Sequence, residues 1–484
     1  MSQTTHPAAG TGTAPADAGW QPRQVAAVAI VAVCGVIVAL TQTLLVPVLP
    51  EIQQSLGSST SGTQWLLTVT LLVAAVAVPV FGRLGDLCGK RLMLMVAAAA
   101  LLVGSLVCAA SDSLGWLIVG RAVSGASAAA IPLGISLIGS VLPARRAGAG
   151  IALVSATLGI GGALGLPLAA LVAEHADYHA LFWICVAGGV IALVGIRLAV
   201  VEPPRVATGR LDLGGTALLA AALVALLLPL AQATTWGWGD PRTLGLLAAA
   251  VVLLVVFVLV ERRTASPLVD LVTNARPALL LTNVASICVG FALFASLIGT
   301  AAYVQAPPAS GYGFGSSVLA SGMAMAPSGI AMLLLSPVSA ALSQRFGPKI
   351  ALALGAVVIA LGFLSRIVFT GSYLQIVIGT TIAGAGTGIA YAAMPSLVLR
   401  GAPASELAAA NGLNALARSV GSSLASAIGG TILAASTITL GAYALPSLTA
   451  YRVLFAACAG AAVVGALVAL VIPTARRPEE PAAA

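Results

Sequence analysis

Long apolar runs separated by short polar segments make up most of the chain. Fourteen runs of about 20 residues carry few or no charges, and a helix of that length is what crosses a bilayer core of about 30 Å. The runs are too long for barrel strands and lack the alternation of polar and apolar residues that such strands show. The pattern therefore predicts fourteen membrane-spanning helices. Their approximate ranges are 25–45, 64–81, 92–110, 114–142, 148–172, 181–201, 213–232, 244–260, 279–303, 318–342, 350–369, 373–399, 407–436 and 452–472.

Composition indicates the same class of protein. Of the 484 residues, 60% are hydrophobic and 7% are charged, and a water-soluble domain of that composition would lack the polar surface to cover its core. The six cysteines show no paired spacing, so we expect neither a disulfide framework nor a metal site. The sequence predicts an all-α integral membrane protein without a cofactor.

The formal net charge of +8 is explained by where the basic residues fall. If the N-terminus is inside, most of the 22 Lys and Arg residues lie in inner segments. The positive-inside rule then places both termini in the cytoplasm of a cell-membrane protein, and no nucleic-acid partner is needed. Arg242, Arg452 and Arg366 are expected on the outer side, which leaves Arg121 and Arg418 within spans.

A dense group of charges interrupts the apolar pattern between the second and third spans. The segment GRLGDLCGKR, residues 82–91, is called the charged loop below. A degenerate copy, ALSQRFGPK at residues 341–349, lies between the tenth and eleventh spans and is called the repeated loop. In it Gly347 matches Gly89, and Gln344 takes the place of Asp86. The fourth and twelfth spans repeat at nearly the same offset, as internally duplicated transporters do.

This duplication predicts two six-helix bundles with two inserted helices between them. We expect a disordered cytoplasmic tail at 1–22 and a second cytoplasmic tail at 475–484. The predicted domains are an N-terminal bundle at 23–201, a linker with two extra transmembrane helices at 202–276, and a C-terminal bundle at 277–474.

The pattern G-x-L-x-D-x-x-G-K/R-R resembles the hallmark loop of the major facilitator superfamily, and fourteen spans resemble its drug:proton antiporter branch of multidrug efflux type. The resemblance implies the major facilitator fold and a gating loop that latches the two halves on the cytoplasmic side. The gating residues would be Gly82, Arg83, Asp86, Gly89, Lys90 and Arg91. GIGGALGLP in the fifth span is similar to the antiporter motif of exporters, although its usual Gly-Pro step is displaced; Gly161, Gly165 and Pro167 would carry it.

Physical chemistry gives the charged loop a role beside the resemblance. Glycines permit a tight turn and close backbone approach, while Asp86 can complement the positive N-terminus of a neighbouring helix. Lys90 and Arg91 are equally well explained as topology signals. The segment lacks the spacing of a phosphate-binding loop, so no nucleotide partner is predicted.

Arg121 is the most informative single residue, because an arginine inside a span is costly unless it is paired or wetted. In the resembled family this arginine works beside a first-span carboxylate during proton exchange, but Thr41 stands at that position here. No acidic residue lies deep in a predicted span. The coupling candidates are therefore Arg121 itself with Glu51 and Asp112 at the outer mouth, where His175 and His179 are also expected.

The absence of a midplane carboxylate also bears on the substrate. A cation would find no counter-ion there, while the arginines leave the cavity neutral to positive, which favours neutral or anionic amphiphiles. If Arg418 instead sits near the inner end of its span, a snorkelling anchor is the favoured interpretation. The residues expected to line a cavity are Thr41, Gln42, Phe291, Tyr391, Asn414 and Arg418.

The sequence thus predicts a secondary active transporter, acting as a monomer in the lipid bilayer. It would export small amphiphilic molecules of drug or antibiotic type by alternating access, driven by proton antiport. The missing carboxylate keeps a proton-independent or anion-coupled metabolite carrier open as an alternative. No Ser/His/Asp, HExxH or paired-carboxylate arrangement falls within the spans, so we predict no enzymatic activity.

Overall fold

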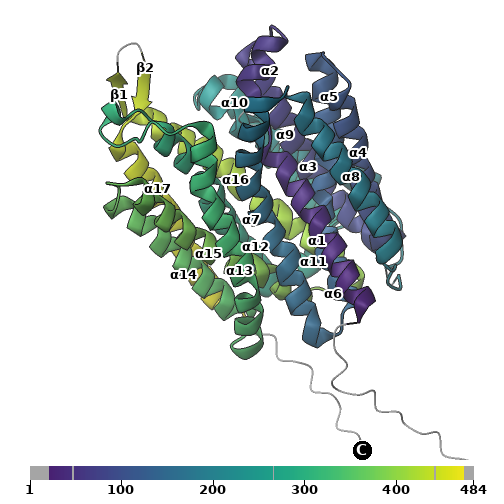
Figure 1. Ribbon diagram of the computed structural model, residues 1–484. Helices are drawn as coiled ribbons and strands as arrows, with labels where there is room; N and C mark the ends of the chain where they lie inside the picture. The colour runs from purple at the N-terminus through teal and green to yellow at the C-terminus, as the bar shows by residue number, and fades with distance from the viewer. Residues whose placement is uncertain (1–20, 46–47, 206, 265, 441–442, 474–484) are drawn as a thin grey trace, which may run out of the picture.

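The structure is a computed structural model that describes residues 21–45, 48–205, 207–264, 266–440 and 443–473. Nearly all of these residues are helical, and the helices run roughly side by side (Figure 1). The elements are α1 Pro22–Thr43, α2 Leu49–Ser55, α3 Thr60–Cys88, α4 Lys90–Ala109, α5 Leu114–Gly125, η2 Ala126–Ala129, α6 Ala130–Val141, α7 Ala144–His175, α8 His179–Ala199, α9 Leu213–Trp236, α10 Pro241–Glu261, α11 Leu271–Asn274, α12 Pro277–Gln305, η3 Pro308–Ser310, α13 Val318–Arg345, α14 Pro348–Val368, α15 Tyr373–Gly401, η4 Ala404–Glu406, α16 Leu407–Ala435, β1 Thr437–Leu440, β2 Tyr443–Pro446 and α17 Leu448–Val471.

The fourteen-span prediction is confirmed, with the fourth span formed by α5, η2 and α6 in succession. Thirteen spans in the described ranges are apolar and long enough to cross a membrane. The remaining one, α16, has 29 residues but carries Asn, Ser, Gly and one Arg among its alanines. Its polar residues are largely buried, because α16 packs against protein on several sides. The predicted tails lie almost wholly outside the described residues.

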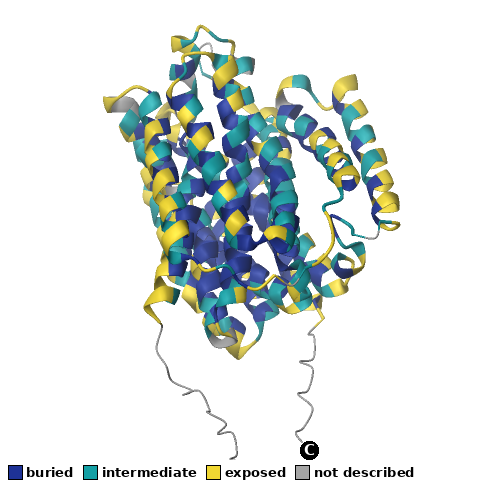
Figure 2. Ribbon diagram, turned by 90° about the vertical axis from the view of Figure 1, so that its right-hand side faces the viewer, coloured by how far each residue is buried: buried dark blue, intermediate teal, exposed yellow. Residues whose placement is uncertain are grey.

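Two helical bundles form the body of the protein. The core of the first is built from α1, α3, α4, α6, α7 and α8, and that of the second from α12 to α17. The bundles meet along two seams, α7 against α13 and α3 against α16. Figure 2 shows buried residues concentrated inside the bundles and exposed ones on the outward faces. This packing agrees with two halves, and the residue boundaries of the domains stay a prediction.

The inserted pair, α9 and α10, lies beside the α3–α16 seam. Leu219, Leu223 and Leu227 of α9 pack in one apolar cluster with Ala75 of α3 and Leu416 of α16. α10 is mostly exposed to the surroundings, as expected of a helix that faces lipid. The pair therefore covers one of the two seams between the halves.

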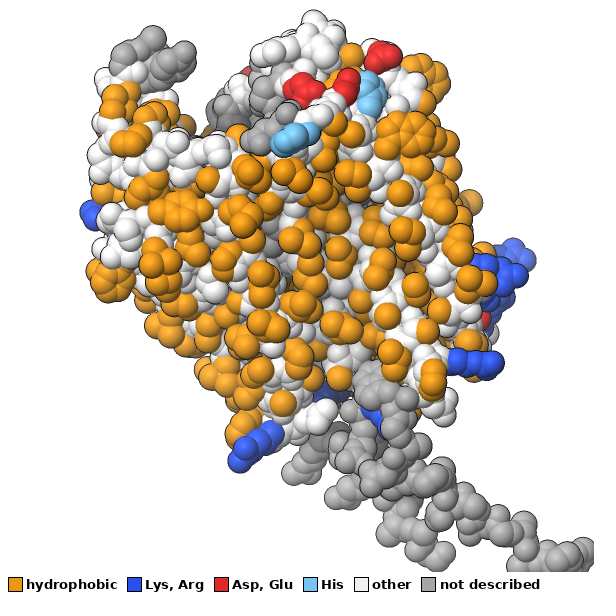
Figure 3. All heavy atoms as spheres, in the orientation of Figure 1, with side chains coloured by type: hydrophobic (Ala, Val, Ile, Leu, Met, Phe, Trp, Pro, Cys, Tyr) orange, Lys and Arg blue, Asp and Glu red, His pale blue; other side chains and the backbone are white. Residues whose placement is uncertain are grey.

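Polar side chains distinguish the two ends of the molecule. Orange hydrophobic side chains cover the lateral face in Figure 3, Lys and Arg gather toward its lower end, and acidic and His side chains lie at its upper end. The end that holds the charged loop is called the loop side, and the end that holds α2 and the β1–β2 hairpin is called the opposite side (Figure 1).

Two details differ from the sequence prediction. An antiparallel hairpin, β1 with β2, precedes α17, where no strand was predicted. Arg366 was expected in an outer segment, but the structure places it in the last turn of α14 with none of its surface exposed. The apolar run ends so close to Arg366 that its sequence position alone does not separate a solvated side chain from an inserted one.

Candidate functional site

The charged loop joins the two halves through Asp86. Its Oδ1 and Oδ2 accept hydrogen bonds from the Ala408 amide at 3.1 and 3.0 Å, and Oδ2 accepts another from the Ala409 amide at 2.9 Å. These amides belong to the first turn of α16, which has no partner for them within the helix. A carboxylate there also complements the positive end of the helix dipole. The predicted pairing of Asp86 with a helix N-terminus is thus present, and the helix belongs to the other half.

Close backbone packing brings the carboxylate to that helix. A Cβ on Gly82 would lie 2.7 Å from the Ala408 carbonyl oxygen, and one on Gly85 would lie 2.5 Å from the Leu133 side chain. Neither position therefore tolerates a larger residue without movement. The glycines of the charged loop let α3 approach α16 at the loop side.

The basic residues of the loop hold it to its own half. Lys90 Nζ donates to Ser140 Oγ at 2.8 Å and lies 3.7 Å from Asp86 Oδ1. Arg91 Nη2 donates to the Arg197 carbonyl at 2.7 Å. The topology-signal interpretation of Lys90 and Arg91 is therefore not their whole role, since both make specific contacts.

Glu202 is a loop-side residue that the sequence did not single out. Its carboxylate accepts hydrogen bonds from the Arg91 and Leu92 amides at 3.3 and 3.2 Å, which caps the first turn of α4. A cavity of about 290 Å³ lies between this residue, Asp86, Lys90 and Arg205. Two carboxylates thus fix the charged loop. Asp86, within the loop, binds the other half, and Glu202 binds the end of the loop from within the same half.

The repeated loop has the same backbone form. Gly89 and Gly347 both have positive φ, +118° and +89°, a region that side chains other than glycine rarely adopt. Each stands immediately before a helix, α4 and α14. The internal repeat seen in the sequence is therefore a structural repeat.

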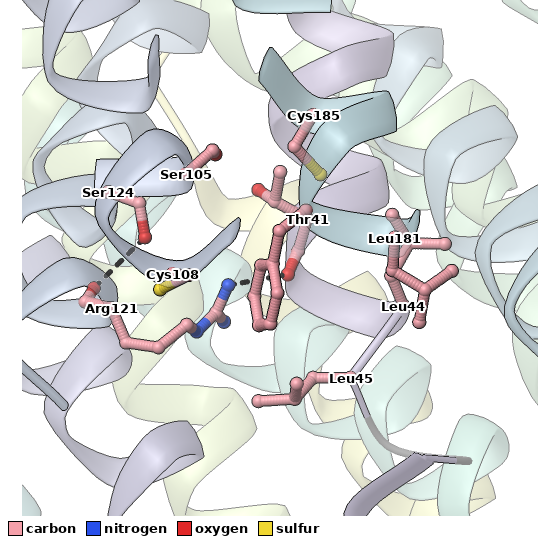
Figure 4. Close-up of a pocket in the computed structure, with 10 residues that line it drawn as sticks. Thr41, Leu44, Leu45, Ser105, Cys108, Arg121, Ser124, Leu181 and Cys185 are labelled. Carbon is pink, nitrogen blue, oxygen red and sulfur yellow. Dashed lines mark hydrogen bonds between the residues drawn. The ribbon is translucent and has the colours of Figure 1, made fainter. Parts of the chain in front are cut away.

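Arg121 lies in a small pocket inside the first half (Figure 4). Its Nη1 donates to the Thr41 carbonyl at 3.2 Å and its Nε donates to the Leu66 carbonyl at 3.4 Å. The pocket encloses about 10 Å³, room for a single water molecule. Its lining is Thr41, Leu44, Leu45, Ser105, Cys108, Arg121, Ser124, Leu181, Phe182 and Cys185, with no carboxylate. The guanidinium is therefore solvated by main-chain carbonyls in place of an acid.

The outer candidates lie apart from that pocket. Glu51 Oε1 accepts the Tyr178 amide at 3.1 Å, while Asp112 lies 3.4 Å from His179 Nε2 and Asp177 lies 2.8 Å from His179 Nδ1. Partial burial raises the pKa of Asp177, but the hydrogen bonds and charge of His179 outweigh it and lower that pKa overall. His179 is thus held between two carboxylates on the opposite side.

The antiporter-type motif packs α7 against both halves. A Cβ on Gly161 would lie 2.3 Å from Ala39 of α1, and the Thr43 hydroxyl donates to the Gly161 carbonyl at 3.3 Å. Pro167 faces Gly322 of α13, where an added Cβ would lie 2.8 Å from the proline nitrogen. The role of the motif is therefore close helix packing, by Gly161, Gly165 and Pro167.

Three of the predicted cavity residues come together in the second half. Arg418 Nη1 donates to Asn414 Oδ1 at 2.5 Å, and its guanidinium lies 5.2 Å from the centre of the Tyr391 ring. The Asn414 amide donates to Asn283 Oδ1 at 3.0 Å and to Ser286 Oγ at 2.7 Å. The sequence analysis did not select Asn283 or Ser286. Their spacing, two polar residues three positions apart in an apolar run, could have indicated them.

The other predicted cavity residues lie elsewhere. Thr41 is buried with its hydroxyl bonded to the Val38 carbonyl, and Gln42 is half-buried on the same helix. Phe291 is buried in the core of the second half. Arg418 is buried about three turns into α16, so its interpretation as a snorkelling anchor at the inner end is wrong.

Comparisons with known proteins agree with this architecture. The family model described as Major Facilitator Superfamily matches residues 31–321 and 289–484. The tetracenomycin C resistance and export protein of Streptomyces glaucescens is 30% identical over 408 residues, covering 84% of this chain and 75% of that protein. The multidrug resistance protein Stp of Mycobacterium tuberculosis (strain CDC 1551 / Oshkosh) is 27% identical over 407 residues, covering 83% of this chain and 74% of that protein.

A solved structure is similar in fold. The human organic anion transporter MFSD10 (TETRAN) superposes with a TM-score of 0.67 at 14% sequence identity, covering 93% of this chain and all of that one. At this identity the likeness concerns the arrangement of helices.

Proposed function

Because the chain belongs to the major facilitator superfamily, a family of membrane transporters, we propose that it exports small amphiphilic molecules of drug or antibiotic type by alternating access. The observation that carries this proposal is the contact of Asp86 with the first turn of α16. It joins the two halves at the loop side through three hydrogen bonds to one carboxylate, few enough for the contact to be released during transport. The named resistance and export activities of the relatives support the direction of transport.

The proposed orientation puts the loop side and both termini in the cytoplasm. The basic residues gathered at that end support it, since short cytoplasmic segments are rich in Lys and Arg. In this orientation the Asp86 contact closes the cytoplasmic entrance, and its release opens the path to substrate from the inside. The protein would act as a monomer, with the bilayer and its substrate as partners.

Proton antiport is the proposed driving force. The proposed coupling residues are Arg121, Glu51 and Asp112, and Asp112 lies 3.4 Å from His179 Nε2 on the opposite side. A second candidate, a proton-independent or anion-coupled carrier, is favoured by one specific observation: the lining of the Arg121 pocket holds no carboxylate.

The test is flux in proteoliposomes loaded with a pH dye under an imposed pH gradient. Cationic, neutral and anionic amphiphiles are added in turn, and both their movement and the internal pH are followed. Proton flux that depends on the compound supports antiport. Movement of compound without proton flux selects the second candidate, and no movement of any compound contradicts the export function.

A further inference from the structure

Apart from Arg83 in the charged loop, three arginines are buried within spans, and each is held by a different kind of group. Arg121, Arg366 and Arg418 are 4%, 0% and 8% exposed. The ion pairs of the described ranges involve Lys90 and His179, so none of them joins these arginines to a carboxylate. Burying a cation without an acidic partner costs free energy. The groups that contact each arginine in place of an acid therefore indicate what that arginine does.

Two of the three arginines are held by fixed groups and enclosed by protein, although Nε and Nη2 of Arg366 have no hydrogen-bond partner among the described residues. Arg121 bonds to main-chain carbonyls of α1 and α3. Arg366 is sealed from solvent, with its guanidinium 3.9 Å from the centre of the Phe455 ring and Nη1 donating to Ser296 Oγ at 3.3 Å. Neither leaves surface for a ligand of any size.

Arg418 differs in both partner and exposure. It keeps the largest exposed fraction of the three, and its partner is the neutral side-chain oxygen of Asn414. A guanidinium carries five donors, and Asn414 occupies one of them. The Tyr391 ring beside it offers an apolar surface.

The depth of the group is that of a transport site. Arg418 lies about three turns into α16, or about 16 Å along the helix axis, and Tyr391 lies at a similar distance from the loop-side end of α15. Half of a bilayer core is about 15 Å. Substrates of duplicated transporters bind near this midplane.

We propose that Arg418, Asn414 and Tyr391 form a binding site for the anionic group of an amphiphile, the guanidinium taking a carboxylate or phenolate and the Tyr391 ring packing against its apolar part. Asn283 and Ser286 hold the Asn414 amide in place and so position its oxygen toward Arg418. An incoming carboxylate would bind the guanidinium donors that Asn414 leaves open, and a charged, bidentate partner makes the stronger bond. This site rests on the proposed export function and narrows its substrates to those with an anionic head.

The test uses three fluorescent probes that share a pyrene ring: pyrenebutyrate, pyrenebutanol and pyrenebutyltrimethylammonium. Binding to the purified full-length protein is measured by pyrene fluorescence. Wild type is expected to bind the carboxylate about 10- to 100-fold more tightly than the alcohol, the range for a hydrogen bond to a charged group. The ammonium probe is expected to bind most weakly.

The variants separate the site from general effects. Arg418→Gln keeps a donor for Asn414 and should lose the preference for the carboxylate while alcohol binding changes less than about twofold. Arg418→Lys should keep part of the preference, because it keeps the charge but not the planar fork. Arg366→Gln, at a sealed arginine, should leave the preference intact; thermal unfolding of each variant checks that it is folded.

The outcomes distinguish this site from the export function. Equal binding of the three probes by wild type, or a preference that survives Arg418→Gln, overturns the anion site and leaves export of neutral molecules standing. Failure of all three probes to bind contradicts both the site and the proposed export of amphiphiles.

Discussion

The charged loop and the repeated loop occupy matching places in the two halves but hold different groups. Both turn through a glycine of positive φ before a helix. Asp86 in the first carries a negative charge to the first turn of α16, whereas Gln344 in the second is a neutral amide. Two copies of one turn can therefore keep the same backbone while a single side chain decides which of them holds the halves together by charge.

The same contrast applies to the buried arginines of the two halves. Arg121 in the first half is held by main-chain carbonyls, and Arg418 in the second by the side chain of Asn414. The first half thus bonds its arginine to the main chain, and the second bonds its arginine to one neutral side chain. This difference is the reason for proposing structural coupling of α1 and α3 for Arg121 and ligand contact for Arg418.

The largest expected effect comes from removing the side chain of Arg121, the arginine that is held by main-chain carbonyls. Arg121→Ala should lower transport in proteoliposomes at least about 100-fold, because two hydrogen bonds from a charged donor are lost and each contributes about 1.5–3 kcal/mol. Insertion should persist, since the span stays apolar. The amount of protein in the membrane fraction and the transport rate are measured together, and wild-type transport by this variant would remove the role assigned to Arg121.

A second variant pair compares the two loops directly. Asp86→Asn should slow turnover about tenfold with little change in substrate affinity, because the amide loses a charge–dipole contact worth about 1 kcal/mol or somewhat more. Gln344→Ala is the matched change in the repeated loop and should alter turnover less than about twofold. Equal slowing by both variants would show that the loops are equivalent and that charge does not distinguish them.

The paired glycines give a smaller effect, on stability. Gly347→Ala should cost about 1–2 kcal/mol for the strained backbone. Gly89→Ala should cost more, because its Cβ would also lie 2.8 Å from the Glu202 carboxylate, while nothing lies within 4 Å of a Cβ at Gly347. Thermal unfolding in detergent measures the difference, and a larger loss at Gly347 would contradict the role given to Glu202.

The smallest expected effect is a pH dependence at the loop side. Burial and the nearby charge of Asp270 raise the pKa of Glu406 above its ordinary 4.5, against the opposing effects of Thr273 and Arg83. A raised carboxyl pKa means that the stability contribution is present at low pH and is lost as the pH rises through the folded value. After screening by solvent the loss should be at most about 1 kcal/mol.

Unfolding temperatures of wild type and Glu406→Gln between pH 4 and pH 8 test this sign. The contribution of Glu406 to the change of unfolding temperature with pH should be absent in the variant. An unchanged slope would assign the pH dependence to other carboxyls.

The fold could be predicted from the sequence because apolar runs and bilayer thickness leave few alternatives, and because the repeat is visible at the charged loop. The pairing of Asp86 with a helix N-terminus could also be predicted from its charge. The identity of that helix could not, because Ala408 lies 322 positions later in the chain. Arg366 and Glu202 were missed or misplaced because both stand at the ends of apolar runs. At the end of an apolar run, the sequence does not tell whether a charged side chain lies in solvent or inside the protein. Only the packing of the surrounding helices decides this.

The distance along the chain between Asp86 and Ala408 has a consequence for biosynthesis. At a synthesis rate of about 5–20 residues per second, roughly half a minute passes between the appearance of the carboxylate and that of the amides that it binds. During that time the carboxylate of the first bundle has no partner, because α16 has not yet been made. The contact between the halves can therefore form only late in synthesis, when the β1–β2 hairpin and α17 remain to be made, and a ribosome stalled before α16 would leave the first bundle without it.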